Sequence, residues 1–229
     1  MIYILYRQRL LNNEKKILTL EQDMLRSQMN PHFVFNSLNS IKQYIISNEK
    51  KNAVHYLNKF AKLIRKILDA SRVKVVPLGD ELETMDLYMS IENIRFSNEI
   101  HFDVLVDSDI NLDQIKIPSL VLQPFLENAL WHGLSSKKGI KNIKLSVASA
   151  EKDFITITIS DNGIGRAAAQ KIANDKIVKR KSIGIALTKN RLSNFVKDFK
   201  NNFSFYFVDL KDENEKPSGT EVVLRIPLR

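Results

Sequence analysis

The sequence has 229 residues, which suits one large domain or two small ones, and its hydrophobic fraction of 44% is ordinary for a soluble globular protein. The absence of cysteine excludes disulfides, thiolate catalysis and cysteine metal sites, and it fits a reducing compartment. The net charge of +9 is compatible with nucleic acid, anionic lipid or nucleotide phosphates, or with a solvated basic surface. Because the basic residues do not cluster on an aromatic-rich strand, we expect no direct binding of nucleic acid.

The chain begins with a short apolar stretch, Met1–Tyr6, followed by Arg7 and Arg9. A membrane-spanning helix needs about 20 apolar residues, so this stretch is too short to cross a bilayer. It is either the cut end of a transmembrane helix with basic residues on the cytoplasmic side, or the first turns of a soluble helix. The first interpretation is favoured. It predicts the cytoplasmic portion of an inner-membrane protein, attached through a missing N-terminal region.

Helices are predicted through the N-terminal third. A weak heptad pattern at Leu10, Ile17, Leu20 and Met24 indicates a signalling helix within residues 1–27. Residues 28–76 are expected to form a helical hairpin with a turn at 47–51. The expected apolar stripes are Val34, Leu38, Ile41 and Ile45 on the first helix, and Ala53, Leu57, Phe60, Ala61, Ile64 and Leu68 on the second. A single hairpin is too thin to bury these stripes, so two copies should pair as a homodimeric four-helix bundle.

Residues 77–229 mix helices and strands, which predicts an α+β domain whose sheet is covered by helices on one face. Residues 73–79 read as a linker and residues 166–181 as a charged loop. The expected helices are 80–96, 119–134 and 183–199, and the expected strands are 100–106, 143–148, 154–160, 203–210 and 220–227.

His32 is the first candidate functional residue. It lies opposite the predicted apolar stripe of its helix, directly after Pro31, a residue that kinks a helix interior at a cost of roughly 3 kcal/mol. Imidazole is largely neutral at pH 7, so one ring nitrogen can attack phosphorus while the other keeps its proton. Asn36, one turn later, could orient that ring or hold a water.

Four further motifs follow in the C-terminal part. Asp161-Asn162-Gly163-Ile164-Gly165 ends a strand, where an aspartate can accept a hydrogen bond from an exocyclic amine such as that of adenine. In Gln123–Gly133, Asn128 and His132 share a helix face, and the asparagine oxygen is a fair ligand for Mg²⁺. Ser182-Ile183-Gly184 precedes a helix, as a phosphate site would require. Ser218-Gly219-Thr220 leads into the last strand.

Together these motifs resemble the LytS-type sensor histidine kinases. The segment Asn30–Asn39 is similar to that family's NPHF-containing phosphoacceptor box. The other four motifs follow in the family's order: Gln123–Gly133 resembles its N box, Asp161–Gly165 its G1 box, the motif at Ser182 its G2 box and the motif at Ser218 its G3 box. The resemblance implies a dimerisation and phosphotransfer hairpin followed by a Bergerat-type ATP-binding sandwich of the GHKL class. It also implies autophosphorylation by Mg-ATP, and transfer to an aspartate on a response regulator, often of the LytTR type.

The resemblance also assigns roles to residues. His32 would be the phosphoacceptor, with Asn36 beside it, and Asn128 would hold Mg²⁺. Residues 166–181 would form the lid over ATP. The expected nucleotide-binding residues are Asn128, His132, Asp161, Gly163, Gly165, Ser182, Gly184 and Thr220.

Two departures from the family pattern leave alternatives open. Ser182 stands where the G2 box more often has a glycine, which keeps open a degenerate scaffold that binds ATP without phosphotransfer. No carboxylate follows His32, so the general base is either Glu127 or solvent, or no strong base is needed. A serine kinase or ATPase on the same fold is a further alternative, against which the hairpin and its histidine argue.

Overall fold

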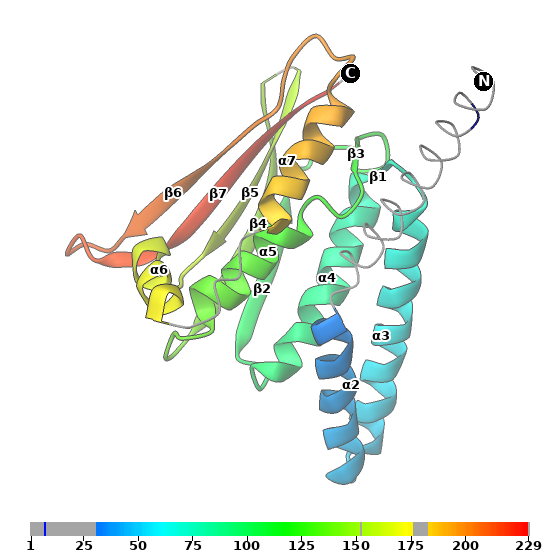
Figure 1. Cartoon of the computed structure of the whole chain (residues 1–229), viewed down its shortest axis with the longest axis vertical. Coiled ribbons are helices and arrows are strands. Elements are labelled where there is room, and N and C mark those ends of the chain that lie inside the picture. Colours follow the sequence, from blue (N-terminus) through cyan, green and yellow to red (C-terminus); the bar gives the residue numbers. More distant parts are fainter. Residues whose placement is uncertain (1–6, 8–30, 152, 176–182, 229) are drawn as a thin grey trace. The chain divides into compact units, whose positions relative to one another are not determined.

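The computed structural model describes residue 7 and residues 31–151, 153–175 and 183–228, which carry colour in Figure 1. The chain divides into two units, residues 1–72 and 73–229. Apart from Arg7, the predicted signalling helix lies outside the described residues. Over the ranges just given, no helix combines the length and the apolar character that a bilayer-spanning helix needs.

Two helices make up the described part of the first unit: α2 (Pro31–Ile46) and α3 (Lys50–Ser71). They lie where the sequence predicts them and are joined by a tight turn (Figure 1). Asn48 takes a positive φ of 60° in this turn, and the amide of Glu49 donates to the carbonyl of Tyr44 at 2.8 Å. This hydrogen bond closes the end of α2 because it satisfies a carbonyl that has no partner within the helix.

The buried sides of the two helices differ from the predicted stripes. Of the four stripe residues of α2, only Ile41 is buried, and the helix buries Phe33 and Ser37 beside it. Phe33 lies 6.4 Å from Phe60 between ring centroids. The buried residues of α3 are Ala53, Phe60, Leu63, Ile67 and Ala70. Each helix of the hairpin therefore has more apolar surface than is buried in this chain. Most residues of the predicted stripes lie on the part that stays exposed.

The second unit is built on a five-stranded mixed sheet with the order β2-β4-β5-β7-β6. Strands β2 and β4 are parallel, and every other neighbouring pair is antiparallel. The strands are β2 (Ile100–Val106), β4 (Lys141–Glu151), β5 (Phe154–Asp161), β6 (Ser204–Lys211) and β7 (Pro217–Pro227). Alternation is clearest in β5, where every second residue from Ile155 to Asp161 is buried.

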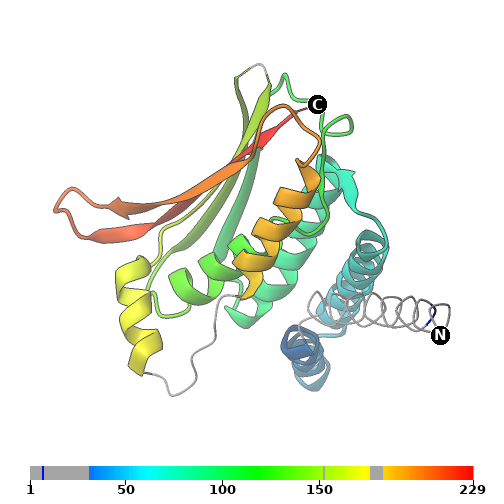
Figure 2. The ribbon, with the colours of Figure 1, turned by 45° about the horizontal axis from the view of Figure 1, so that its top comes forward.

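Helices cover one face of this sheet, as Figures 1 and 2 show. They are α4 (Leu78–Arg95), α5 (Gln123–Asn128), the π-helix η1 (Ala129–Leu134) and α7 (Ile183–Phe195). The core between sheet and helices is mainly aliphatic, with Tyr88 and Phe125 buried among the aliphatic side chains. Its fully buried members include Leu78, Met85, Leu126, Leu130, Leu145, Ile157 and Leu224. The α+β architecture with helices on one face is confirmed.

Three local predictions in this unit are wrong. Residues 166–175 form helix α6 (Arg166–Asp175) rather than a charged loop, because the run of three alanines favours helix. The expected helix over 119–134 begins only at Gln123, since Leu120 takes a positive φ of 54°. The expected linker contains strand β1 (Val75–Pro77), which pairs antiparallel with β3 (Lys116–Pro118).

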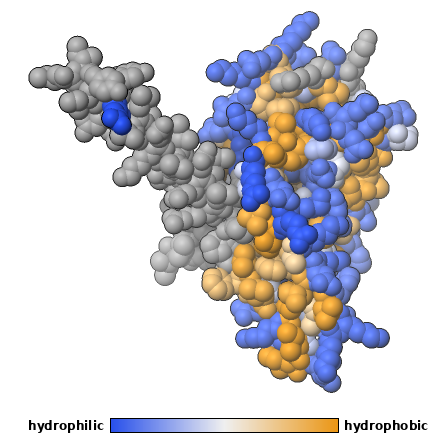
Figure 3. Space-filling model, turned by 90° about the vertical axis from the view of Figure 1, so that its right-hand side faces the viewer, coloured by the Kyte–Doolittle hydropathy of each residue, from blue (hydrophilic) through white to orange (hydrophobic). Residues whose placement is uncertain are grey.

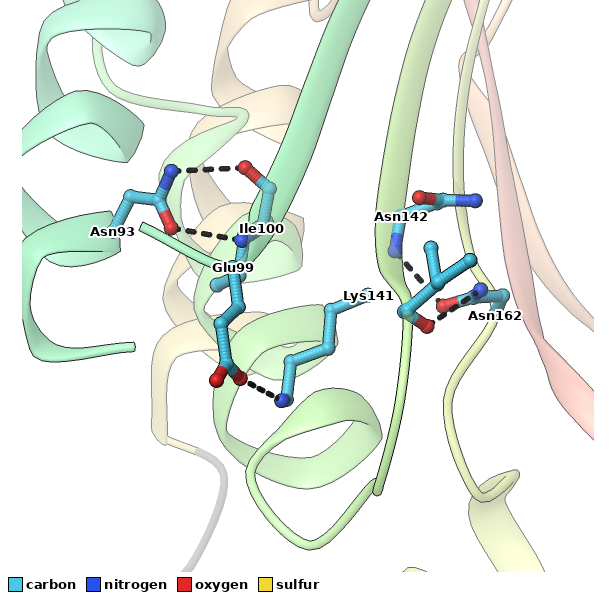
Figure 4. Close-up of polar contacts among 7 residues, drawn as sticks. Asn93, Glu99, Ile100, Lys141, Asn142 and Asn162 are labelled. Carbon is cyan, nitrogen blue, oxygen red and sulfur yellow. Dashed lines mark hydrogen bonds and ion pairs between the residues drawn. The ribbon is translucent and has the colours of Figure 1, made fainter. Parts of the chain in front are cut away.

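Asparagine side chains fix two turns near the ends of the strands (Figure 4). Asn93 of α4 exchanges two hydrogen bonds with the backbone of Ile100, at 2.8 and 2.9 Å, and so imitates a strand partner at the start of β2. Asn162, directly after β5, accepts from the amide of Asn142 at 2.9 Å and donates to the carbonyl of Ile140 at 3.2 Å. The second of these braces holds the turn that carries the aspartate-glycine motif.

Candidate functional site

A cavity of about 760 Å³ lies in the second unit, at the ends of strands β5, β7 and β6. Its size is typical of a site for a small molecule or cofactor. Helices α5, η1 and α6 supply other parts of its wall. The lining residues are Phe125, Asn128, Ala129, His132, Gly133, Ile159, Asp161, Gly165, Arg166, Ala167, Ala169, Gln170, Ile185, Phe207, Asp209, Thr220 and Val222.

The strand register explains why the wall that the sheet forms in this cavity is partly apolar and partly polar. Ile159 pairs with Val222, which pairs with Phe207, so one row of the sheet presents three apolar side chains. Two residues further along, Asp161 pairs with Thr220, which pairs with Asp209. Because side chains two residues apart share a face, the apolar row and the polar row lie side by side in the same cavity. Such a surface can hold a flat apolar group with polar edges.

Asp161 is the buried acid of the polar row. Its Oδ1 accepts a hydrogen bond from the amide of Gly163 at 2.8 Å. Burial raises the pKa of the Asp161 carboxyl to about 6, and hydrogen bonds from the amides of Gly163 and Thr220 and the charge of Lys137 act against that rise. Above about pH 6 the carboxylate is ionised and has acceptor capacity left for a donor inside the cavity.

Two glycines allow the end of β5 to approach η1 closely. A Cβ on Gly133 would lie 2.6 Å from Oδ1 of Asp161, and a Cβ on Gly163 would overlap the backbone of Gly133. The amide of Ile164 donates to the carbonyl of Gly133 at 3.1 Å across the same contact. Any side chain at either glycine would push the helix away from the strand and move the carboxylate. The sequence predicts that Gly163 contacts a ligand, whereas in the structure Gly163 makes this backbone contact with Gly133.

Asn128 and His132 line the cavity from the helical side. Asn128 ends α5 and His132 lies in η1, a single π-helical turn of the kind that often occurs at functional sites. Burial lowers the pKa of the His132 imidazole, so the ring is neutral at pH 7. The two side chains offer an amide and a neutral imidazole, which can donate to or accept from a polar ligand.

One ion pair at the cavity was not predicted. Arg166 donates from Nε and Nη2 to the two carboxylate oxygens of Asp209, at 2.7 and 2.8 Å. The guanidinium also lies 5.3 Å from the ring centroid of Phe207. The pKa of Asp209 is lowered because it accepts these hydrogen bonds. No motif indicates this pair, since its partners are 43 residues apart. Asp209 comes into the row of Asp161 only through the register of β5, β7 and β6.

Several expected site residues lie elsewhere. The Glu127 carboxylate does not line the cavity and accepts hydrogen bonds from Gln123 at 2.9 Å and Tyr88 at 3.4 Å. Gly184 packs against Pro124: a Cβ placed on Gly184 would lie only 3.2 Å from the Cβ of Pro124. Ser182 lies outside the described residues. His32 and Asn36 both belong to helix α2, which lies in the first unit and not in the unit that contains the cavity.

The lining residues fit a magnesium ion that arrives with phosphates. Among the described residues there is no group of three or more histidine, aspartate or glutamate side chains that could hold a metal alone. Mg²⁺ usually keeps several waters and takes few protein ligands beside phosphate oxygens. The amide oxygen of Asn128 would be such a ligand.

Comparison with known proteins agrees with the motifs. A family model described as histidine kinase matches residues 20–100. The sensor protein LytS of Bacillus subtilis (strain 168) is 33% identical over 62% of this chain and 23% of its own length. The sensor histidine kinase BtsS of Escherichia coli (strain K12) is 30% identical over 94% of this chain and 35% of its own. These matches confirm the resemblance to LytS-type sensor histidine kinases.

Two further proteins are similar to this chain. YwpD of Bacillus subtilis (strain 168) is 33% identical over 77% of this chain and 62% of its own length. The histidine kinase domain of the blue-light activated kinase from Erythrobacter litoralis EL346 aligns over 86% of this chain and 96% of its own, with 13% identity and a TM-score of 0.47. The chain thus spans less than two thirds of each of the sequence relatives named here.

Proposed function

We propose that this chain is the kinase portion of a two-component sensor, which uses Mg-ATP to phosphorylate its own His32. The observation that carries the proposal is a cavity that combines a buried carboxylate, Asp161, with apolar walls and the amide of Asn128. A match to a histidine kinase family model over residues 20–100, a range that includes His32, supports it.

The cavity residues suit the two ends of a nucleotide. The ionised carboxylate of Asp161 would accept a hydrogen bond from the adenine amine, and Ile159, Val222 and Phe207 would contact one face of the base. Asn128 and His132 would lie toward the phosphates. The Mg²⁺ that accompanies ATP would neutralise phosphate charge, which is the main electrostatic demand of phosphoryl transfer.

The acceptor is His32 in this proposal. A neutral imidazole attacks the γ-phosphorus through one nitrogen, the bond to the β–γ bridging oxygen breaks, and ADP leaves. The proton on the other nitrogen can be lost afterwards, so no strong base is required. Because Glu127 is hydrogen-bonded to Gln123 and Tyr88, we assign it no role as base and prefer solvent for that step.

We further propose that two copies pair through their hairpins. The described hairpin leaves large apolar side chains exposed, which a second copy would cover. In the view of Figure 3, apolar side chains gather near the α2–α3 turn. The exposed apolar residues of the two helices are Phe35, Leu38, Ile45, Ile46, Val54, Leu57 and Leu68.

The wider setting follows from the resemblance. The phosphoryl group would pass from His32 to an aspartate of a response regulator, and the resemblance favours a regulator of the LytTR type. The whole protein would be attached to a membrane. Both are proposals about the whole protein, of which this chain matches a part.

The test is incubation with γ-labelled ATP and Mg²⁺, beside a His32→Gln variant and a His101→Gln control on β2. We expect acid-labile, base-stable label on the wild type and the control, and none on His32→Gln. Full labelling of His32→Gln would show that the acceptor is another residue. Nucleotide binding without label in the wild type would favour the scaffold alternative.

A further inference from the structure

The Arg166–Asp209 pair joins two elements that both line the cavity. Arg166 is the first residue of α6, and Asp209 lies on β6, one of the two edge strands of the sheet. The pair is bidentate, with both hydrogen bonds below 3 Å. An arginine fork on a carboxylate fixes the direction of both side chains, which a lysine cannot do.

The pair closes the β6 side of the cavity. Asp161 and Asp209 occupy the same row of the sheet, with Thr220 between them, so they stand two strand spacings apart, roughly 10 Å. Arg166 lies over Phe207, the last member of the neighbouring apolar row. A ligand bound to Asp161 and lying on Ile159 and Val222 would therefore meet the guanidinium and the Phe207 ring at its far side.

Fold stability does not account for the arrangement. Both side chains are about half exposed, at 50% and 54%, and exposed ion pairs contribute little to folding. Both partners nevertheless line the cavity, as do Ala169 and Gln170, which follow Arg166 at helical spacing on the same face of α6. The pair is thus better placed to position α6 beside a ligand than to hold the domain together.

We propose that Arg166 and Asp209 are positioning residues that brace α6 against edge strand β6 and form the side wall that retains the base of a bound nucleotide. The proposal rests on the proposed nucleotide site. Loss of either partner would let the first turn of α6 move away from the sheet, and the nucleotide would leave faster while its contacts to Asp161 and Asn128 stayed in place.

The retention test uses radiolabelled ADP with Mg²⁺, chased with excess unlabelled ADP, so that no phosphoryl transfer intervenes. We expect Arg166→Ala and Asp209→Ala each to raise the dissociation rate about 5- to 20-fold. The charge-swapped double variant, Arg166→Asp with Asp209→Arg, should recover much of the loss. Arg225→Ala is the matched control, because Arg225 also lies over a phenylalanine ring, 4.9 Å from Phe154, but does not line the cavity.

The bracing test is made without nucleotide. We expect amide hydrogen exchange in the first turns of α6 to be faster in Arg166→Ala than in the wild type, with an unchanged melting temperature. Dissociation rates within twofold of wild type in both single variants, or no rescue by the charge swap, would overturn the proposal. If the wild type retained no ADP while α6 exchange still changed, the proposed nucleotide site would fail and the bracing of α6 would stand.

Discussion

The carboxylate of Asp161 lies where two backbone amides, from Gly163 and Thr220, donate to it, and it is only 7% exposed. Replacement by asparagine keeps the shape of the side chain but removes its charge. It also places an NH2 group, which is a donor, where one of the two acceptor oxygens had faced those amides. We expect Asp161→Asn to weaken ATP binding by about 10- to 100-fold, because a hydrogen bond to a buried charged group contributes about 1.5–3 kcal/mol. Calorimetric titration with ATP measures this. Asp103→Asn, exposed on β2, should bind like the wild type.

The raised pKa of Asp161 gives nucleotide binding a pH dependence. Because its pKa is about 6 and the ionised form accepts the amine, affinity should rise with pH through 6 and level off above 7. At pH 5, one unit below that pKa, affinity should be about tenfold lower than at the plateau. Titrations of wild type and Asp161→Asn from pH 5 to 8 separate this effect from titration of the ligand itself. An equal slope in both proteins would contradict the assignment.

Two glycines offer a matched pair of substitutions. In Gly163→Ala the new methyl group would collide with the backbone of Gly133, which cannot move without displacing η1. We expect a loss of about 1–3 kcal/mol of unfolding free energy, together with weaker ATP binding. In Gly79→Ala the nearest atoms lie at an ordinary 3.5 Å, and alanine favours helix by up to about 1 kcal/mol. Urea unfolding of both variants tests the contrast.

At the scale of elements, a buried acid connects α4 to the segment that precedes α5. The carboxylate of Glu81 accepts from the amides of Leu120 and Leu122, at 2.8 and 3.0 Å. Arg191 of α7 donates to the carbonyls of Ser119 and Leu120 on the other side of the same segment. The start of the helix that carries Asn128 is therefore held from two directions, which explains why residues 119–122 are not helical.

Glu81 also gives the fold a pH dependence. Burial raises its pKa from 4.5 to about 7, against hydrogen bonds from the segment's amides and the charge of Arg191. The folded state thus favours the protonated acid. This stabilisation is present below pH 4.5 and is lost as pH rises through 7, by at most about 3 kcal/mol. Urea unfolding at pH 4.5 and 7.5 measures this loss of unfolding free energy. We expect Glu81→Gln to be without it, whereas Glu213→Gln, at the exposed β6–β7 turn, should show the same loss as the wild type.

At the scale of the whole molecule, the exposed stripe of the hairpin predicts self-association. Leu57 of α3 is 48% exposed, and a charge there would be buried without a partner in a paired bundle. We expect Leu57→Glu to convert dimers to monomers in sedimentation equilibrium. Tyr206→Glu is the control, because Tyr206 is 52% exposed but lies on β6. A wild type that sediments as a monomer would contradict the proposed pairing.

Periodicity and motif order were sufficient for much of the fold. The alternation of Ile155, Ile157 and Ile159 predicts β5 with its correct buried face, because side chains of a strand alternate regardless of their surroundings. The helices of the hairpin and the helix-covered sheet follow from similar local patterns. Local patterns failed where a distant group decides the backbone, as at Leu120, whose amide is bound by Glu81.

The same division applies to the site. From the sequence, the chemistry of the motifs indicates Asp161, Asn128 and His132 as site residues, and the resemblance to LytS-type kinases adds Gly165 and Thr220. All five line the cavity. Only the tertiary structure decided that Arg166 meets Asp209, that Glu127 turns to Tyr88, and which faces of the hairpin stay exposed. These depend on strand register and helix rotation, which are set by packing between segments far apart in the chain.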